Sequence, residues 1–197
     1  WSSDVESFLK ETPAEIRGIE EEACRAPSEE VKPQEGKPSV VVGCDGFGED
    51  LKNAVVQHLQ GKGIDVRDLG NGKFFSVAAQ VAKDVQQDPS SVKGMLFCGT
   101  GMGVSIVANK FKGVYAAPAE NEDCARNSRA INNANVLCLG GKLTAEADAL
   151  KIADAFLEQE FTSPPGGYMA PFWSSDVESF LKETPAKIQK IEEEARD

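Results

Sequence analysis

The sequence predicts a three-layer α/β/α sandwich built on a five-stranded parallel sheet, with helical extensions at both ends. Short apolar runs rich in valine and leucine alternate with longer segments of helical periodicity, the order expected of βα units. The runs are apolar on both faces, which is typical of parallel strands covered by helices on each side. With 197 residues and 41% hydrophobic residues, the chain is long enough to bury one such core.

The elements follow each other along the chain from residue 39. Each predicted helix has an apolar stripe, and turn signals such as Asp88-Pro89 separate helices from strands. The result is a Rossmann-like α/β fold. The predicted strands are 39–43, 64–69, 95–98, 113–117 and 135–139, and the predicted helices are 49–61, 76–87, 104–110, 121–131 and 144–158.

The two ends of the chain carry the same sequence. Residues 1–14 recur unchanged as residues 173–186. Each copy predicts two short helices, the first with a capping box from Ser3 and Glu6, the second with Pro13 at its first position. The repeat indicates one unit of a tandem array, or alternatively an engineered or terminal duplication. The predicted organisation is 1–25 helical, 26–37 linker, 38–161 α/β domain, 162–172 loop and 173–197 the second helical copy.

Composition excludes several function classes. A net charge of −11 argues against nucleic acid as a partner, because no basic stripe is present to neutralise phosphates. Five scattered cysteines without a Cys-x-x-Cys pair suggest a reducing compartment and no structural zinc. No stretch is long and apolar enough to span a membrane. We therefore expect a cytoplasmic protein, with a plastid location left open, and no cofactor. The single histidine, His58, is expected to be a solvated surface residue.

A glycine-rich loop follows the third predicted strand. The strand ends at Cys98, and Gly99, Gly101 and Gly103 alternate before the next helix begins. Such a loop can present several N–H groups to an anion or a developing oxyanion, and the same field favours a thiolate. Cys98 is therefore a candidate base beside a candidate oxyanion cradle. The alternative is a tight turn with a small buried cysteine.

A second polar residue converges on this loop. Asp45 follows the first predicted strand, and ligands in parallel α/β folds bind beyond the carboxyl ends of the strands. We expect Asp45 and Cys98 to share one crevice.

Several motifs resemble those of a known family. They are residues 42–45, 98–106, 108–110 and 132–137 with Gly140-Gly141. Over about residues 39–161 the chain resembles ribose-5-phosphate isomerase B and its relatives, including galactose-6-phosphate isomerase. Residues 113–117 and the repeated Trp-Ser-Ser look most like an isomerase-like branch found in some eukaryotes.

The resemblance implies an aldose–ketose isomerisation through an enediolate, on a homodimer or higher oligomer whose sites lie between subunits. By position, Cys98 matches the base, Thr100 a hydroxyl near the reacting oxygens, and Asp45 a carboxylate that fixes sugar hydroxyls. The residues that match substrate contacts are Gly99, Gly101, Met102 and Gly103 of the loop, Gly46, Phe74, and Asn132 from the partner chain.

Five positions depart from the family pattern. Gly46 replaces a phosphate-binding histidine, Ile131 the histidine of ring opening, and Phe74 a pocket tyrosine. Tyr168 and Phe172 replace two phosphate-binding arginines. Losing three charge-assisted bonds of roughly 1.5–3 kcal/mol each would lower phosphate affinity by about three orders of magnitude.

Two functions therefore remain open. The first is an isomerase acting on a sugar phosphate or a less charged sugar, with altered phosphate recognition. The second is a non-catalytic sugar-binding or structural module of a repeat protein. A metal site at Glu120, Glu122 and Asp123 is a weaker alternative, because carboxylates at a helix start usually complement its dipole. The aromatic stretches 74–75 and 168–173 could form a sugar platform, but core packing is favoured.

Overall fold

The computed structural model describes residues 17–19 and 40–194 and contains a five-stranded, all-parallel sheet. The strand order is β2-β1-β3-β5-β4, so β3 lies at the centre. This confirms the predicted fold class. The strands are β1 (Val40–Cys44), β2 (Val66–Asn71), β3 (Lys93–Cys98), β4 (Ala116–Pro118) and β5 (Val136–Gly140).

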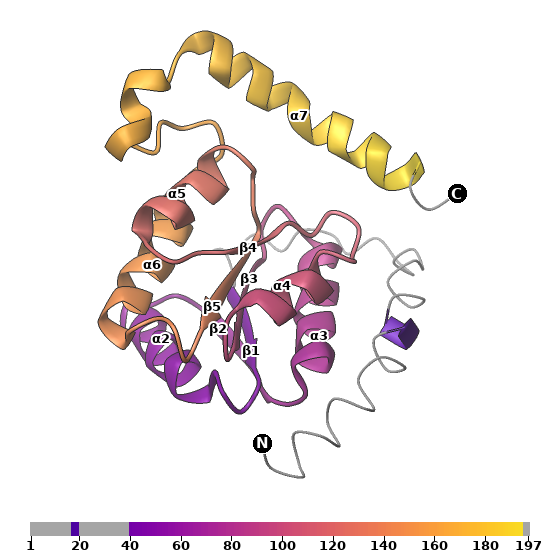
Figure 1. The fold of residues 1–197 in the computed structure, drawn as a ribbon, viewed down its shortest axis with the longest axis vertical. Coiled ribbons are helices and arrows are strands. Elements are labelled where there is room, and N and C mark those ends of the chain that lie inside the picture. Colours follow the sequence, from indigo (N-terminus) through magenta and orange to yellow (C-terminus); the bar gives the residue numbers. More distant parts are fainter. Residues whose placement is uncertain (1–16, 20–39, 195–197) are drawn as a thin grey trace.

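Helices cover both faces of the sheet, as Figure 1 shows. One layer contains α2, α5 and α6, and the other contains α3 and α4. The helices are α2 (Glu49–Gly61), α3 (Phe74–Gln87), α4 (Met102–Ala108), α5 (Glu122–Ala130) and α6 (Glu146–Glu158), followed by the 3₁₀ helix η1 (Gly167–Phe172) and α7 (Ser175–Glu194).

Side chains of each strand alternate between the two layers. In β3, Met95 and Phe97 pack toward α2 and α6, whereas Leu96 and Cys98 pack toward α3 and α4. All four are buried. This two-sided burial explains why the strands read as continuous apolar runs, and it places the Cys98 side chain in the α3–α4 layer.

The fourth strand is shorter and later than the predicted 113–117. Asn135, which is buried, donates to the Gly113 carbonyl and accepts from the Tyr115 N–H, both at 2.8 Å. Asn109 pairs in the same way with both backbone groups of Ala116, at 2.8 Å. The Asn135 amide takes backbone groups of Gly113 and Tyr115 that a longer ladder would have used, so β4 begins only at Ala116.

The second repeat copy forms one helix, so the prediction of two short helices is wrong for this copy. α7 continues through Pro185, and the Thr184 hydroxyl donates to the Phe180 carbonyl at 3.0 Å, adding a bond at the turn where proline supplies none. The cap also differs. Ser174 accepts from the Val177 N–H at 3.3 Å, while the Glu178 carboxylate accepts from the Trp173 indole at 2.9 Å.

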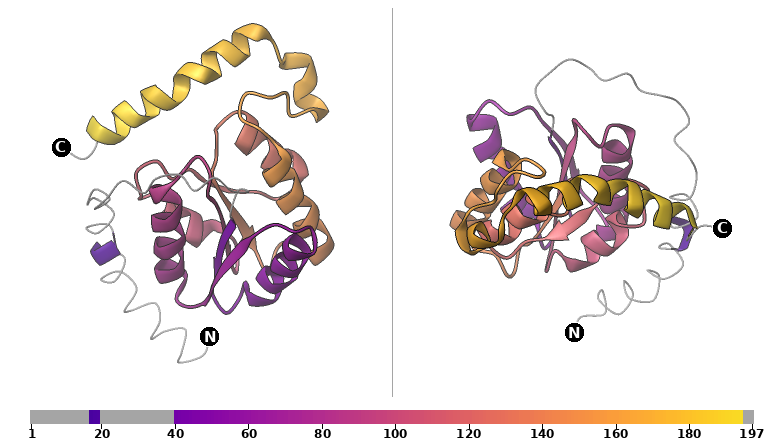
Figure 2. Two further views of the ribbon diagram at one scale, coloured as in Figure 1. Left: turned by 180° about the vertical axis from the view of Figure 1, so that it is seen from behind. Right: turned by 90° about the horizontal axis from the view of Figure 1, so that it is seen from above.

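The helix α7 lies across the edge of the sheet where the strands begin, away from their carboxyl ends (Figures 1 and 2). An ion pair ties it to the loop before β4, with Glu193 2.9 Å from Lys112. The Glu192 carboxylate accepts from the Gly113 N–H at 3.3 Å. Within the described ranges, no helix combines the length and apolar character needed to cross a membrane.

The first repeat copy is described only at residues 17–19, which are helical. The predictions for residues 1–16 and for the linker 26–37 lie outside the described residues. The stretch predicted as a loop, 162–172, contains η1. Phe172 in that helix is 68% exposed, so the prediction of core packing is wrong at this residue.

Candidate active site

Three loops meet at the carboxyl edge of the sheet, after β1, β3 and β5. The Asp45 N–H donates to the Phe97 carbonyl at 3.0 Å, and the Gly141 N–H donates to the Cys98 carbonyl at 2.8 Å. The Lys142 N–H donates to the Gly99 carbonyl at 3.1 Å. The predicted convergence of Asp45 and Cys98 therefore follows from main-chain bonds that join both loops to the end of β3.

Glycines make this close approach possible. A Cβ at Gly48 would lie 2.7 Å from the Phe97 carbonyl oxygen, and one at Gly140 would lie 2.9 Å from the Thr100 Cα. A Cβ at Gly141 would overlap the Phe47 carbonyl oxygen. Contacts this short with main-chain atoms leave no room for any side chain, so the backbone itself fixes the geometry of the site.

Cys98 lies at the centre of the three loops. Its side chain is 5% exposed, and its Sγ accepts a hydrogen bond from the Gly101 N–H at 3.1 Å. Gly101 has φ +77°, a left-handed conformation that glycine adopts without strain. This turn directs the Gly101 N–H at the sulfur, so that a main-chain donor lies against the Cys98 side chain.

The neighbouring thiols have a different environment. Burial raises the pKa of Cys44 to about 11. Burial, with a smaller contribution from Cys98, raises the pKa of Cys138 much further. Both are fully enclosed, at 0% and 1% exposure. Cys44 and Cys138 are therefore protonated core residues at neutral pH, which leaves Cys98 as the candidate base among the strand cysteines.

The glycine loop has an apolar rim. The Phe47 side chain lies 3.6 Å from the position of a Cβ at Gly99, and the Phe74 ring lies 3.3 Å from that at Gly103. Phe74 is thus beside the loop, where the sequence predicted a pocket residue. Within the loop, the Thr100 hydroxyl accepts from the Met102 N–H at 3.3 Å. Met102 begins α4 and is 53% exposed.

Asp45 supports the loop that it begins. Its Oδ1 accepts from the Phe47 N–H at 2.9 Å and from the Gly48 N–H at 3.1 Å. Burial raises the pKa of Asp45, and these two donors partly offset that effect. Oδ2 takes no part in either bond. The carboxylate therefore holds the β1–α2 turn and lies at the carboxyl edge of the sheet.

A carboxylate lies close to Gly46. The Asn71 amide nitrogen lies 3.9 Å from the position of a Cβ at Gly46 and donates to the Glu49 carboxylate at 2.9 Å. A carboxylate therefore lies near the position where the family pattern has a phosphate-binding histidine. Sequence reasoning missed Phe47, Glu49 and Asn71, because nothing in their local pattern signals contacts with residues of other loops.

Ile131 and Asn132 lie at the opposite edge of the sheet from Cys98 of the same chain. They follow α5, which runs back from the carboxyl end of β4 toward the start of β5. Asn133 beside them has φ +51°, and its side-chain oxygen accepts from Arg129 at 3.2 Å. One chain does not bring Asn132 to Cys98, so a role for Asn132 requires a second copy and stays a prediction.

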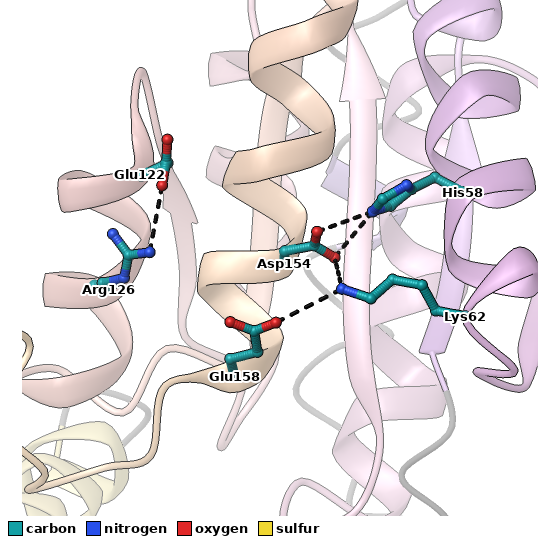
Figure 3. Close-up of polar contacts among 6 residues, drawn as sticks. All are labelled: His58, Lys62, Glu122, Arg126, Asp154 and Glu158. Atoms are coloured by element: carbon teal, nitrogen blue, oxygen red, sulfur yellow. Dashed lines mark hydrogen bonds and ion pairs between the residues drawn. The ribbon is translucent and has the colours of Figure 1, made fainter.

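His58 is not the solvated residue that the sequence predicted. Its Nε2 lies 3.0 Å from both carboxylate oxygens of Asp154, and Lys62 lies 2.7 Å from the same carboxylate (Figure 3). Glu158 pairs with Lys62 at 3.6 Å. His58 is near the end of α2 and joins it to α6. The only imidazole of the chain is therefore at the far end of α2 from the candidate site.

The acidic cluster after β4 has structural contacts. Asn121 caps α5 by accepting from the Cys124 N–H at 2.8 Å, Glu122 pairs with Arg126 at 3.3 Å (Figure 3), and Asp123 lies against Gly167. Among residues 17–19 and 40–194, no group of three or more His, Cys, Asp or Glu side chains is arranged to hold a metal ion.

The chain is similar to a protein-family model and to several known proteins. The ribose/galactose isomerase family model matches residues 40–166. The DNA damage-repair/toleration protein DRT102 of Arabidopsis thaliana is 41% identical over 77% of this chain, which spans 49% of that protein's length. The 4-deoxy-4-sulfo-D-erythrose isomerase of Clostridium sp. (strain MSTE9) is 39% identical over 78% of this chain and 95% of that protein.

A solved structure agrees with these matches. Ribose-5-phosphate isomerase B from Mycoplasma genitalium, with bound ribulose-5-phosphate, has a TM-score of 0.68 at 33% identity and covers 79% of this chain and 97% of that one. The family model covers well over half of the 197 residues. The chain therefore belongs to the ribose/galactose isomerase family of sugar-phosphate isomerases.

Proposed function

We propose that the chain is an aldose–ketose isomerase that uses Cys98 as its base and acts on an open-chain four-carbon sugar with an anionic group on C4. The observation that carries the proposal is the Gly101 N–H donating to Cys98 Sγ at 3.1 Å, in a chain of an isomerase family. That bond places a main-chain N–H donor at the Cys98 sulfur, at the carboxyl end of the central strand.

The chemistry is a proton transfer between adjacent carbons. The Cys98 thiolate removes the C2 proton of the aldose, and the electron pair forms the C1=C2 bond of an enediolate with its charge on O1. The proton returns to C1, O2 becomes the carbonyl, and the O2 proton passes to O1. The loop 99–103 stabilises the enediolate with main-chain N–H groups, and Asp45 binds a sugar hydroxyl.

The substrate class follows from the missing ring-opening acid. The resemblance assigns that role to a histidine at the position of Ile131, whose side chain cannot transfer a proton, and His58 is engaged by Asp154 between α2 and α6. A five-carbon aldose 5-phosphate closes its ring through O4. A four-carbon aldose substituted at C4 has no O4 hydroxyl with which to form a five-membered ring, so it needs no ring opening. The similarity to a 4-deoxy-4-sulfo-D-erythrose isomerase supports this class.

A second copy completes the site in this proposal. Apolar side chains around the site are exposed, with Phe47 at 61%, Met102 at 53%, Ile106 at 63% and Leu143 at 67%. Exposed apolar residues gathered in one region are typical of an interface. We infer a homodimer in which this region is covered and Asn132 of the second copy approaches the substrate.

The experiment compares three substrates by kcat/KM, with exchange of the C2 proton into D₂O as a second readout. They are erythrose 4-phosphate, 4-deoxy-4-sulfo-erythrose and ribose 5-phosphate. We expect at least a tenfold preference for a four-carbon substrate. Cys98→Ser should lower turnover about 10³-fold, whereas Cys138→Ser, at a protonated core thiol, should retain it. Equal loss in both variants would reject Cys98 as the base.

Ile131→His separates the substrate argument from the mechanism. It should raise turnover of ribose 5-phosphate and leave four-carbon turnover unchanged. A wild-type preference for ribose 5-phosphate would overturn the four-carbon class and leave the base assignment intact. Sugar binding without proton exchange on any substrate would identify the alternative, a non-catalytic sugar-binding module, which the carboxylate beside Gly46 and the apolar Ile131 favour.

A further inference from the structure

The chain contains two copies of one helical sequence and a single α/β domain. Beyond the identical residues 1–14 and 173–186, the copies share Ile16 with Ile188, and residues 19–23 with 191–195. Ile19 and Ile191 are therefore equivalent positions. Equivalent sequences present the same apolar face, so both copies should favour the same kind of surface.

The two equivalent isoleucines have different environments. Ile19 packs against the apolar cluster of the α3–α4 layer, and residues 17–19 lie beside α3 in the views of Figures 1 and 2. Ile191 is 63% exposed. The contact of Ile19 thus identifies a surface to which this isoleucine can bind. The equivalent Ile191 is exposed and does not occupy that surface in its own chain.

The packing of α7 on its own domain buries Leu181 but leaves two other apolar residues of the helix exposed. The described ties near its end are the exposed Lys112–Glu193 pair and the Gly113–Glu192 bond, and exposed pairs contribute little to stability. Phe180 is 61% exposed. Helix α7 therefore buries Leu181 but leaves Phe180 and Ile191 exposed, and its described polar ties to the domain are weak.

We propose that the α3–α4 face is a docking surface for this repeated helix, and that α7 of a second copy of the chain binds there in competition with the segment around Ile19. The contact is head-to-tail, because the C-terminal helix of one copy meets the α3–α4 face of the next. The chain's own first copy has the advantage of a high effective concentration, so the face becomes available to a second copy only when that segment is weakened.

A labelled peptide of residues 173–197 tests the surface on the full-length chain. Ile19→Glu frees the face, so it should bind the peptide at least tenfold more tightly than the wild type does. A peptide that carries Ile191→Glu should bind the Ile19→Glu chain at least tenfold more weakly than the unaltered peptide. Equal binding to wild type and Ile19→Glu, or insensitivity to the peptide substitution, would overturn the proposal.

Light scattering of full-length chains tests the second-copy arrangement. Ile19→Glu should form concentration-dependent assemblies larger than the wild type, and Ile19→Glu with Ile191→Glu should return to the wild-type size. Ile19→Ala, a milder change, should show the same order if Ile19→Glu unfolds the chain by circular dichroism. Assemblies that persist in the double variant would reject α7 as the occupant. Isomerase activity does not enter either readout.

Discussion

The two edges of the sheet are held together by different kinds of contact. At the carboxyl edge, main chain packs directly on main chain, and Gly48, Gly140 and Gly141 leave no space for a Cβ. At the amino edge, side chains do the joining, through the amide of Asn135 and the ion pair of Lys112 with Glu193. The site edge is therefore fixed by backbone geometry, while the opposite edge depends on polar side chains that can change singly and can carry an added helix.

The largest expected effect is at the carboxyl edge. Gly141→Ala forces a Cβ into the Phe47 carbonyl, so either the β1–α2 turn or the β5–α6 turn must move. We expect a loss of about 3 kcal/mol in the free energy of unfolding and loss of isomerase activity, measured by urea unfolding and turnover. Gly61→Ala is the control, because a Cβ at this α2 residue meets nothing within 4 Å. A stable and active Gly141→Ala chain would contradict the inference that backbone packing fixes the carboxyl edge.

Asn135→Ala is the strongest test of the amino edge. The substitution removes the partners of the Gly113 carbonyl and the Tyr115 N–H at a residue that is 4% exposed. The expected cost is about 2 kcal/mol in the free energy of unfolding, because two backbone groups lose their bonds. Activity of the folded chain should persist. Loss of activity without loss of stability would show that the two edges are coupled.

Lys93 gives the amino edge a pH dependence. Burial, with a smaller effect of Arg129, lowers the pKa of Lys93 to about 8, below the unfolded value of about 10.4. Between these values the unfolded chain binds more protons, so this lysine makes the free energy of unfolding rise with pH. The free energy of unfolding, measured with urea at pH 7.5 and at pH 10, should rise less in Lys93→Met than in the wild type. Lys151→Met, a change at an exposed lysine of α6, is the control and should keep the wild-type rise. The same rise with pH in Lys93→Met and in the wild type would contradict this prediction.

The smallest expected effect is that of Lys112→Ala. Both partners of the Lys112–Glu193 pair are exposed, at 44% and 63% of their side chains. We expect a change of less than about 0.5 kcal/mol in the free energy of unfolding and none in turnover. A cost above about 1 kcal/mol would mean that this ion pair holds α7 firmly to its own domain, and it would weaken the contrast between the two edges.

The order of strands and helices could be predicted because it depends on periodicity and on glycine and proline signals. The helix Glu49–Gly61 was predicted with its observed bounds. Errors arose where a distant group decides an end. The helix predicted at 104–110 runs over Met102–Ala108, because left-handed Gly101 starts it early and Asn109, just after it, bonds Ala116 seven residues away.

The centre of the candidate site and the nearby Phe74 were predictable, whereas side-chain contacts between residues distant in the sequence were not. Cys98, the glycine loop and Asp45 occupy strand ends, and parallel topology brings such positions together. The contact of Asn71 with Glu49 joins residues 22 apart, and the pairing of His58 with Asp154 joins residues 96 apart. Such pairings depend on how helices and loops pack in three dimensions, which no local pattern encodes. Pro185 inside α7 likewise overrides the usual expectation that proline begins or ends a helix.

The position of the single histidine has an experimental consequence. Because the chain has one imidazole, bonded to Asp154 at the junction of α2 and α6, a nuclear magnetic resonance spectrum of its ring protons contains one pair of signals. That pair reports the packing between these two helices without isotope labelling of single sites. A shift of the signals on adding a sugar would register a movement transmitted along α2 from the turn that Asp45 holds.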